Sequence, residues 1–534
     1  MARGVFRPPL RFHTSRSGPG AKAAGFPTHM TRMRPTVRLV TAVTVAILAA
    51  SCGNSPEPIT RLDFRAARLA VNPGPARGPL RLLPENPRYF TDSSGRAIFL
   101  TGSHTWDNRQ DIGTRRFEWT EYLTRLQEYN HNFIRLWVWE QPKGLTTGPD
   151  PAEPMATLTP ELFSRTGPGF AADGAPKFDL TKYNAAFFGR LRQRIIDARD
   201  RGIYVSIMLF NGWSVEQKAG GGDPWKYHPF NRGNNITGID GDPNHDGRGA
   251  ETHSLQIPAV TRIQEAYVRK VLDTVADLDN VLYEISNESD ADSEAWQYHL
   301  INYIKSYEAT QTTPHPVGMT AESPPGSNAS LLGSAADWIS PIDDRGYKSD
   351  PPIAPGGKVI LLDTDHLWGI GGDRSWAWKS FTRGLNVLYM DPWDAQVIPV
   401  TPNPDLRVNM GYILFYARRM NLRAMRPLPQ LASTGYCLAD PGSTYLVYLP
   451  GVDDGINMRF VARLFKLASP WISRHVNLDL PAVRGTLAIE WFNPRTGEIL
   501  RTGSIKGGGN VRFTAPFGGD AVLYLTHGWN GSQH

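Results

Sequence analysis

From about residue 86 onward, short apolar runs alternate with segments whose apolar residues recur at helical spacing. The runs lie at 97–102, 133–139, 204–210, 281–286, 316–320, 337–340, 358–362 and 385–390. Such runs are typical of strands buried on both faces of a parallel sheet. Between them, residues such as Val260, Ile263, Tyr267 and Val271 follow spacings of three and four, which predicts helices. Eight strands with intervening helices predict a (β/α)8 TIM barrel over residues 86–426.

The pattern changes in residues 427–534. Short strand candidates are separated there by Gly, Pro and Asp turns, at 436–439, 445–449, 476–480, 486–492, 511–514 and 521–525. This pattern of short strands and turns predicts a small antiparallel β-sandwich. One segment, 458–472, has a helical pattern instead.

The first 52 residues have the features of an export signal. Arg32, Arg34 and Arg38 precede an apolar run at 39–50, which is too short for a membrane span of about 20 residues. Residues 48–52 resemble a bacterial lipobox ending in Cys52. We therefore expect an exported protein attached to a membrane of the cell envelope through lipidated Cys52; the alternative is a plain signal peptide and a secreted protein. The proline-rich residues 53–85 are expected to form a linker.

Charge and cysteine content narrow the function classes. The formal net charge is +6, but residues 1–51 contain eight Lys or Arg and no Asp or Glu. The remaining chain has 49 basic and 51 acidic residues, so its near-neutral charge does not favour a nucleic-acid partner. Cys437 is the only other cysteine, and with Cys52 acylated no internal disulfide is expected.

Acidic residues follow two of the predicted barrel strands, and active sites of TIM barrels lie at the C-terminal ends of strands. The fourth strand leads into Asn287 and Glu288, and the seventh leads into Asp363 and Asp365. Cleavage of a glycosidic bond needs one carboxyl group to protonate the leaving oxygen and a second to attack or to activate water. We predict Glu288 as the acid/base and Asp363 as the nucleophile, because Asp363 directly follows the strand, with Asp365 as the alternative.

Further polar and aromatic residues surround these carboxyl groups in the predicted barrel. Arg135 on the second strand would keep the nucleophile ionised, and Asn287 would bind a sugar hydroxyl. Sugar rings stack on indole rings, and histidines at strand ends could bind hydroxyls. The remaining candidates for substrate binding are His104, Trp106, Trp139, His366 and Trp368. Each of them could instead have a purely structural role.

These residues carry a family resemblance. Asn132-x-x-Arg135 and Asn287-Glu288 resemble clan A glycoside hydrolases, and the segments 87–90 and 100–106 resemble apiosidase-like and cellulase-like barrels. The segments 436–442 and 491–497 resemble a β-sandwich catalogued as a collagen-binding domain. The resemblance implies a hydrolase of poly- or oligosaccharides that retains configuration and requires no cofactor.

The sequence departs from the clan A pattern at one catalytic position. The nucleophile of clan A is usually Glu, whereas here it would be Asp, which is one methylene shorter. Retention needs about 5–5.5 Å between the carboxyl groups and inversion about 6.5–9.5 Å, so the substitution leaves the stereochemical outcome open.

One motif suggests a structural calcium ion. Asp242, Asn244 and Asp246 stand at alternate positions before Gly247, like the first half of an EF-hand loop. The twelfth position is His253 instead of Glu, so the bidentate ligand is missing. The alternatives are a polar turn and a substrate loop on the catalytic face after the third strand.

Two other functions are compatible with the same residues. A metal-dependent TIM-barrel hydrolase would use His104, Asp107, His366 and Asp391, although Trp106 occupies the second position of the usual His-x-His. A noncatalytic lipoprotein would bind a polymer through the C-terminal domain.

Overall fold

The computed structural model describes residues 60–62, 74–92, 94–114, 116–145, 155–216, 222–312, 314–323, 326–393, 403–451, 475–480, 483 and 485–527. Residues 54–534 form one compact unit. The predicted leader with Cys52 and the helical segment 458–472 lie outside the described residues. No helix within the described ranges is long and apolar enough to cross a bilayer.

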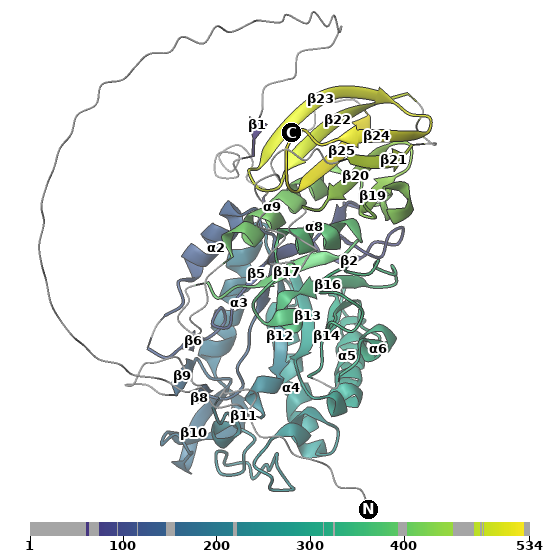
Figure 1. The fold of residues 1–534 in the computed structure, drawn as a ribbon. Coiled ribbons are helices and arrows are strands. Elements are labelled where there is room, and N and C mark those ends of the chain that lie inside the picture. Colours follow the sequence, from purple (N-terminus) through teal and green to yellow (C-terminus); the bar gives the residue numbers. More distant parts are fainter. Residues whose placement is uncertain are drawn as a thin grey trace, which may run out of the picture. The chain divides into compact units, whose positions relative to one another are not determined.

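Eight parallel strands form the barrel (Figure 1). They are β5 (Thr101–His104), β7 (Phe133–Leu136), β12 (Tyr204–Asn211), β13 (Val281–Asn287), β14 (Val317–Thr320), β15 (Trp338–Ser340), β16 (Val359–Asp363) and β17 (Asn386–Met390). Their order is β5-β17-β16-β15-β14-β13-β12-β7. The end strands approach each other where the Asn132 N–H donates to the Thr101 carbonyl at 3.0 Å. The predicted TIM barrel is therefore confirmed.

The helices follow the strands in the expected alternation, with one exception. They are α2 (Trp119–Glu128), α3 (Ala185–Arg199), α4 (Pro258–Val275), α5 (Glu294–Glu308), α6 (Asn328–Gly333), α7 (Thr364–Trp368), α8 (Arg374–Thr382) and α9 (Pro404–Arg419). In α4 the predicted apolar stripe is buried, including Val260, Tyr267 and Val271. Between β15 and β16 the chain 341–358 forms no helix, so the sixth βα unit is incomplete.

The N-terminal end of the barrel is closed by an apolar cluster. Leu80 packs there with Phe90, Leu100 and Trp338. Leu80 and Leu83 are each 1% exposed, although both lie in the expected linker 53–85. Short strands β2 (Arg81–Leu82), β3 (Phe90–Thr91) and β4 (Ala97–Ile98) pair across this end. Residues 74–85 of the expected linker are thus packed against the barrel, because their leucines bury apolar surface among the prolines, whereas Thr60 and Arg61 pair with the C-terminal sheet.

The loops after the first two barrel strands contain additional β-structure. The strands β6 (Asp111–Ile112), β8 (Lys143–Leu145) and β9 (Ala156–Thr159) form one small sheet. A hairpin follows, with β10 (Phe163–Phe170) and β11 (Pro176–Tyr183). These insertions extend the C-terminal face of the barrel.

The C-terminal region forms two antiparallel sheets, as predicted. The larger has the order β1-β23-β22-β25-β20-β19-β18, and the smaller pairs β21 with β24. The bounds are β1 (Thr60–Arg61), β18 (Arg426–Pro427), β19 (Cys437–Asp440), β20 (Thr444–Leu449), β21 (His475–Asp479), β22 (Thr486–Asn493), β23 (Glu498–Lys506), β24 (Asn510–Thr514) and β25 (Ala521–His527). An apolar core that includes Val447, Leu478 and Leu487 belongs to both sheets.

The sequence analysis missed β23. Its residues are mostly polar, and Gly503 has a φ of +111°, which breaks the alternation expected for a strand. The partner strand β22 contains a register shift between Ile489 and Glu490 opposite this point. Cys437 is buried as a small apolar residue, and burial raises the pKa of its thiol to about 12.

Barrel helices contact the C-terminal sheet through a buried acidic residue. The carboxylate of Glu490 is fully buried and accepts hydrogen bonds from Tyr416 Oη at 2.7 Å and Arg419 Nη1 at 2.8 Å. Because Tyr416 and Arg419 belong to α9, this network couples the two predicted domains.

Candidate active site

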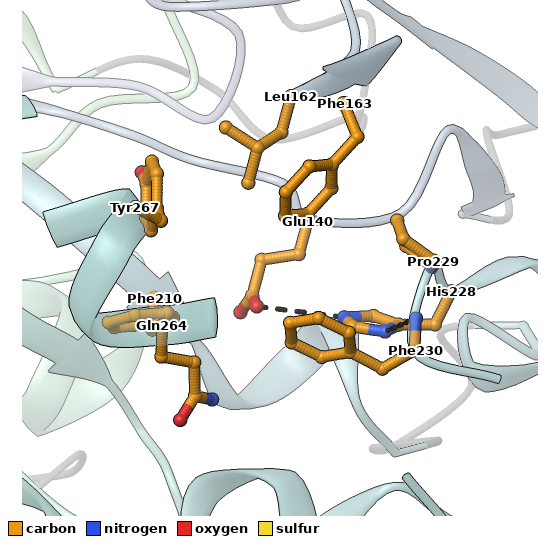
Figure 2. A pocket seen from close by; sticks show the side chains of 9 residues that line it. All are labelled: Glu140, Leu162, Phe163, Phe210, His228, Pro229, Phe230, Gln264 and Tyr267. Carbon is orange, nitrogen blue, oxygen red and sulfur yellow. Dashed lines mark hydrogen bonds and ion pairs between the residues drawn. The ribbon is translucent and has the colours of Figure 1, made fainter. Parts of the chain in front are cut away.

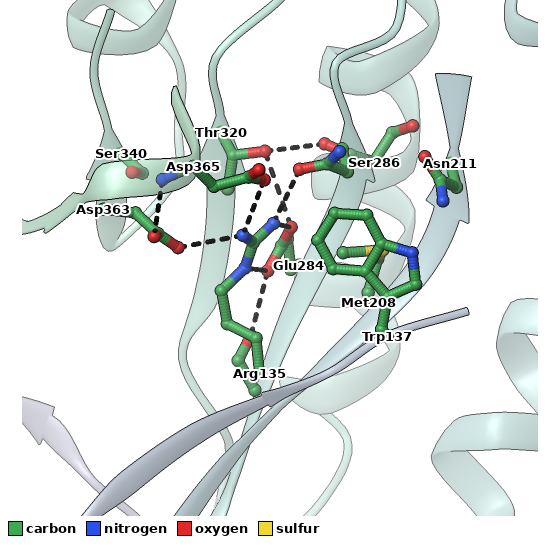
Figure 3. Close-up of polar contacts among 12 residues, drawn as sticks. Arg135, Trp137, Met208, Asn211, Glu284, Ser286, Thr320, Ser340, Asp363 and Asp365 are labelled. Carbon is green, nitrogen blue, oxygen red and sulfur yellow. Dashed lines mark hydrogen bonds and ion pairs between the residues drawn. The ribbon is translucent and has the colours of Figure 1, made fainter. Parts of the chain in front are cut away.

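Arg135, on β7, is the centre of a buried polar network at the C-terminal end of the barrel (Figure 3). Its side chain is 1% exposed. The guanidinium donates to Glu284 Oε2 at 2.9 Å and Oε1 at 2.5 Å, and to Asn287 Oδ1 at 2.9 Å. It also donates to Asp363 Oδ2 at 2.9 Å and contacts Asp365 Oδ2 at 3.4 Å. One cation therefore joins residues of β13 and β16.

The sequence analysis assigned no role to Glu284. It lies inside β13, is fully buried, and pairs with Arg135 through both oxygens. Ser206 Oγ and Thr320 Oγ1 lie 3.4 and 3.5 Å from the same carboxylate. A carboxylate buried within an apolar strand must be paired with a cation. The position of Glu284 inside the apolar run 281–286 could therefore have identified it from the sequence as part of a buried ion pair.

Asp363, at the end of β16, uses both carboxylate oxygens within the protein. Oδ1 accepts the backbone N–H of Asp365 at 3.0 Å, which caps α7. Oδ2 contacts His104 Nε2 at 2.7 Å as well as Arg135. Burial raises the pKa of Asp363, but His104 and Arg135 outweigh burial and hold this pKa well below its ordinary value. Asp363 is 0% exposed and therefore acts as a fixed anion.

Asp365 lies two residues further on, in α7, with a side chain that is 9% exposed. Burial raises its pKa well above the ordinary value, and repulsion from Glu288 and Asp363 adds to the rise. The contact with Arg135 opposes these effects only in part. Asp365 and Glu288, which are distant in sequence, are thus brought close enough to influence each other's ionisation.

Glu288 follows β13 in an unusual backbone conformation. Its φ is +47°, in the left-handed region that non-glycine residues seldom occupy. Trp213 Nε1 donates to Glu288 Oε2, and Ser323 Oγ donates to the Glu288 carbonyl at 2.8 Å. A Cβ on Gly212 would lie 2.2 Å from the same carbonyl, so only glycine fits there. Such conformations persist where the surroundings impose them, and they cluster at functional sites.

The two predicted partners Asn287 and His366 contact each other. His366 Nε2 lies 3.1 Å from Asn287 Oδ1, and His366 Nδ1 lies 2.7 Å from Ser340 Oγ. Burial and the charge of Arg135 lower the pKa of His366 to about 3, so the ring is neutral and donates from Nε2. Asn287 Oδ1 is thereby occupied, whereas its buried Nδ2 has no hydrogen-bond partner among the described atoms.

The predicted aromatic residues differ in exposure. Trp139 is 5% exposed and its Nε1 donates to the Trp106 carbonyl at 2.9 Å, so its ring offers little surface to a sugar. Trp368 is 37% exposed and packs edge-on against Trp376. Trp213, which contacts Glu288, is partly exposed and was not among the chosen site residues.

Two cavities lie on the same face of the barrel. The first is about 10 Å³ in volume, the size of one water molecule, and is lined by Glu140, His228 and aromatic rings (Figure 2). Burial raises the pKa of Glu140, but His253 and His228 lower it to about 2 overall. The second is about 250 Å³ and is lined by five carboxyl residues: Glu216, Asp246, Glu251, Asp290 and Asp292.

The residues of the metal-dependent alternative do not come together as a metal site. His104 contacts Asp363, His366 contacts Asn287, and Asp391 is paired with Arg407. In the described ranges, no three His, Cys, Asp or Glu side chains are arranged to hold a metal ion. In the predicted calcium loop, Asp242 accepts the N–H groups of Asp246 and Gly247 at 3.1 and 3.0 Å.

The barrel is similar in fold to the barrels of solved glycoside hydrolases. Two solved structures match over most of the chain. A protein titled "Glycoside hydrolase" aligns with a TM-score of 0.54 and 13% identity, covering 84% of this chain and 97% of its own. A glycoside hydrolase of family 5 from Bacteroides vulgatus aligns with a TM-score of 0.53 and 13% identity, covering 84% of this chain and 93% of its own. At this identity the likeness establishes the fold.

Two family descriptions match parts of the chain. Residues 155–324 match "Domain of unknown function (DUF6298)", and residues 468–526 match "Putative collagen-binding domain of a collagenase". The second match confirms the resemblance noted for the C-terminal segments. No curated protein matches the chain significantly.

Proposed function

We propose that the protein is a glycoside hydrolase in which Glu288 and Asp365 are the reacting pair. The observation that carries this proposal is the electrostatic coupling of these two carboxyl groups beside Arg135, at the C-terminal end of a barrel. Hydrolysis of a glycoside needs one protonated and one ionised carboxyl group. Two carboxyl groups that repel each other share a single proton, which meets this requirement.

Asp365 suits the nucleophile better than Asp363, the residue favoured from sequence. Asp363 is 0% exposed, and its oxygens are engaged by His104, Arg135 and a backbone N–H. The side chain of Asp365 is 9% exposed, and its Oδ2 has only long contacts, 3.4 Å to Arg135 and 3.7 Å to His366. A nucleophile must reach the anomeric carbon, so the accessible carboxylate takes this role.

In the proposed mechanism the proton shared by the pair passes from Asp365 to Glu288 when the substrate binds, so that Glu288 protonates the leaving oxygen while Asp365 attacks the anomeric carbon. The covalent intermediate is then hydrolysed by a water molecule that Glu288 deprotonates, with retention of configuration. Arg135 stabilises the ionised form of Asp365. No cofactor takes part, and a calcium ion in the loop 240–253 would be structural.

The test begins with the purified chain and a panel of polysaccharides and 4-nitrophenyl glycosides. With a substrate in hand, Glu288→Ala should lose polysaccharide hydrolysis yet keep cleavage of a glycoside with an activated leaving group, and azide should restore its turnover. Asp365→Asn should lose both activities, because no nucleophile remains. Wild-type activity in Glu288→Gln or in Asp365→Asn would refute the assignment.

We propose that the substrate is a poly- or oligosaccharide and that the protein is exported and held at the envelope by lipidated Cys52. This rests on the basic and apolar pattern at 32–52. Expression in a bacterial host with labelled palmitate should label the wild type and leave Cys52→Ser unlabelled. Labelling of the variant would place the acyl group elsewhere, and absence of label in both would favour a plain signal peptide.

A further inference from the structure

Glu140 is a buried carboxylate that the mechanism above does not use. It lies just after β7 and is 6% exposed. Its Oε1 accepts the backbone N–H of Asn211, the last residue of β12, at 2.9 Å. A buried carboxylate is costly unless it is paired. Among the described residues, its ion-pair partners are His228 and His253, whose Nε2 atoms lie 3.6 and 3.3 Å from its oxygens.

His228 shows which ring nitrogen presents a proton to Glu140 (Figure 2). Its Nδ1 accepts the backbone N–H of Phe230 at 3.1 Å, and a ring nitrogen that accepts a hydrogen bond carries no proton. Burial lowers the pKa of His228, although Glu140 opposes this effect. The ring is therefore neutral, and its single proton is on Nε2, which faces Glu140.

His253 connects Glu140 to Ser289, the residue after Glu288. Its Nε2 faces Glu140, and its Nδ1 lies 3.0 Å from Ser289 Oγ. The negative charge of Glu140 favours a proton on Nε2, so Nδ1 of the neutral ring is an acceptor and the Ser289 hydroxyl donates to it. The ring stacks on Trp296, with 4.6 Å between the ring centroids and 11° between the planes. This stacking fixes the direction in which Nδ1 points.

The backbone at Glu288 and Ser289 is held by two groups of contacts. After β14, Ser323 Oγ donates to the Glu288 carbonyl and the Ser323 N–H donates to the Ser289 carbonyl, both at 2.8 Å. The second group involves Ser289 Oγ, which contacts His253 Nδ1 and lies 2.6 Å from Ser286 Oγ. The left-handed φ of Glu288 persists only where its surroundings impose it, and the Ser289 hydroxyl belongs to those surroundings.

We propose that Glu140 and His253 are positioning residues that act through Ser289 to hold Glu288 in its left-handed conformation. Glu140 keeps the proton of His253 on Nε2, His253 orients the Ser289 hydroxyl, and Ser289 fixes the backbone from which the Glu288 side chain extends. An acid must lie within hydrogen-bond reach of the leaving oxygen, so a small displacement of Glu288 lowers the rate, provided that Glu288 is the acid/base of the proposed function on which this inference rests. Glu140, His253 and Ser289 are all buried, so they act through Glu288 and not on the sugar.

Steady-state kinetics of two variants test the connection between His253 and Ser289. Ser289→Ala removes the hydroxyl, and His253→Phe removes both nitrogens but keeps a ring that can stack on Trp296. Each should lower kcat by about tenfold or more and leave KM unchanged, because general acid catalysis contributes about 10²–10⁴-fold. The double variant should be no slower than the slower single variant, since both substitutions break the same contact. Two losses that multiply, or a wild-type kcat in both single variants, would overturn the proposal.

Glu140→Gln tests the first residue of this series, and Glu308→Gln is its matched control. The amide of Gln lacks the charge, and its NH2 group would face an N–H where the carboxylate accepts one. Glu308, on α5, is 2% exposed and lies 3.2 Å from His315 Nδ1, but this pair contacts the Leu278 carbonyl, before the N-terminal end of β13. Both substitutions should lower the Tm, whereas only Glu140→Gln should lower kcat. A wild-type kcat in Glu140→Gln, or equal losses of kcat in both variants, would contradict the proposed role of Glu140.

The indole N–H resonance of Trp213 provides a measurement that needs no substrate. Trp213 Nε1 donates to Glu288 Oε2, so this resonance reports the position of the Glu288 carboxylate. In the full chain labelled with ¹⁵N-tryptophan, and with the resonance assigned through Trp213→Phe, it should shift in Ser289→Ala and Glu140→Gln and stay in place in Glu308→Gln. If Glu288→Ala keeps wild-type activity, or if no glycoside is cleaved, the proposed function fails, and the resonance still decides whether Glu288 is positioned in this way. An unshifted resonance in folded Ser289→Ala, the smallest of these changes, would overturn the inference.

Discussion

The two ends of the barrel are built from the same eight strands but differ in chemistry. At the N-terminal end, Leu80, Phe90, Leu100 and Trp338 belong to a buried cluster made of apolar side chains. At the C-terminal end, strands β7, β13 and β16 contribute Arg135, Glu284 and Asp363, which are charged and buried. The N-terminal end stabilises the fold through apolar burial. The C-terminal end lowers stability, because holding charged side chains in a buried position has a desolvation cost.

The C-terminal end of the barrel contains an energetically unfavourable arrangement of buried charges. Three acidic groups surround one guanidinium, and the pKa of Asp365 is raised by burial and by its acidic neighbours. Replacing the whole set of charged side chains with apolar residues of similar size would be at least as stable there, whereas removing one partner alone would not. The network is therefore best understood as a device for orienting reacting groups, and each variant below tests one side of the comparison.

Replacing Arg135 with Met should have the largest effect. It leaves Glu284 and Asp363 buried without their shared cation, which should cost about 3–5 kcal/mol of stability. Glycosidase activity should disappear, since Asp365 loses its positive neighbour. Urea unfolding and hydrolysis assays measure both effects. A stable Arg135→Met protein would contradict the view that the network depends on this cation.

Trp338→Ala at the opposite end should separate stability from activity. Trp338 is 0% exposed, and its ring lies directly over Gly318, where a Cβ would be 1.9 Å from Cε2. Its removal should cost about 3–5 kcal/mol. The kcat of the folded fraction should stay unchanged. Trp368→Ala, at an exposed position, is the control and should change stability little; a fall in kcat for Trp338→Ala would contradict the comparison.

Asp365→Asn should stabilise the protein above neutral pH. Because the pKa of Asp365 is raised in the folded state, its contribution to stability is present below the ordinary pKa of Asp and is lost as pH rises. The neutral amide of Asn does not titrate, so the variant does not lose stability in this way. The difference in the free energy of unfolding between Asp365→Asn and wild type should therefore grow between pH 5 and pH 8. Urea midpoints at the two pH values provide the measurement. If the variant is less stable than wild type at pH 8, ionised Asp365 does not destabilise the folded state.

His366→Gln should reduce the sensitivity of the fold to acid. The pKa of His366 is lowered to about 3, so the unfolded chain binds a proton that the folded chain rejects. Stability should fall as pH decreases from about 6.5 toward 3, by up to about 1.4 kcal/mol per pH unit. The variant should lose that part of the slope, whereas His475→Gln, at an exposed position, should keep it. Equal slopes in wild type and His366→Gln would contradict the prediction.

Trp213→Phe should have the smallest effect. It removes the N–H donor to Glu288 Oε2 while keeping an aromatic ring. A donor favours the ionised carboxylate, so its loss should raise the apparent pKa of Glu288 in the pH profile of kcat/KM. We expect kcat/KM to fall by about tenfold. This fall corresponds to about 1.4 kcal/mol, which is close to the contribution of one hydrogen bond to a charged group. An unchanged profile would indicate that Trp213 acts only through packing.

The sequence determined the barrel and the chemistry available at its mouth. Eight apolar runs marked strands buried on both faces. A parallel strand is covered on one face by helices and on the other by the barrel core, so polar residues at alternate positions would be buried. Arg135, Asn287, Glu288 and the two aspartates could be selected because strand ends meet at one face. The β-sandwich followed from short strands between turn residues, although β23 escaped because of its polar residues and Gly503.

Only the tertiary structure decided which of these groups can act. Asp363 and Asp365 are two positions apart, and no local pattern shows that the first caps α7 and is buried while the pKa of the second is raised by Glu288. Likewise Glu251 meets Asn244 through the path of a loop that spacing alone does not define. Burial and partner charges arise from contacts between distant segments, so they are properties of the folded chain. Periodicity records only which face of a segment is apolar.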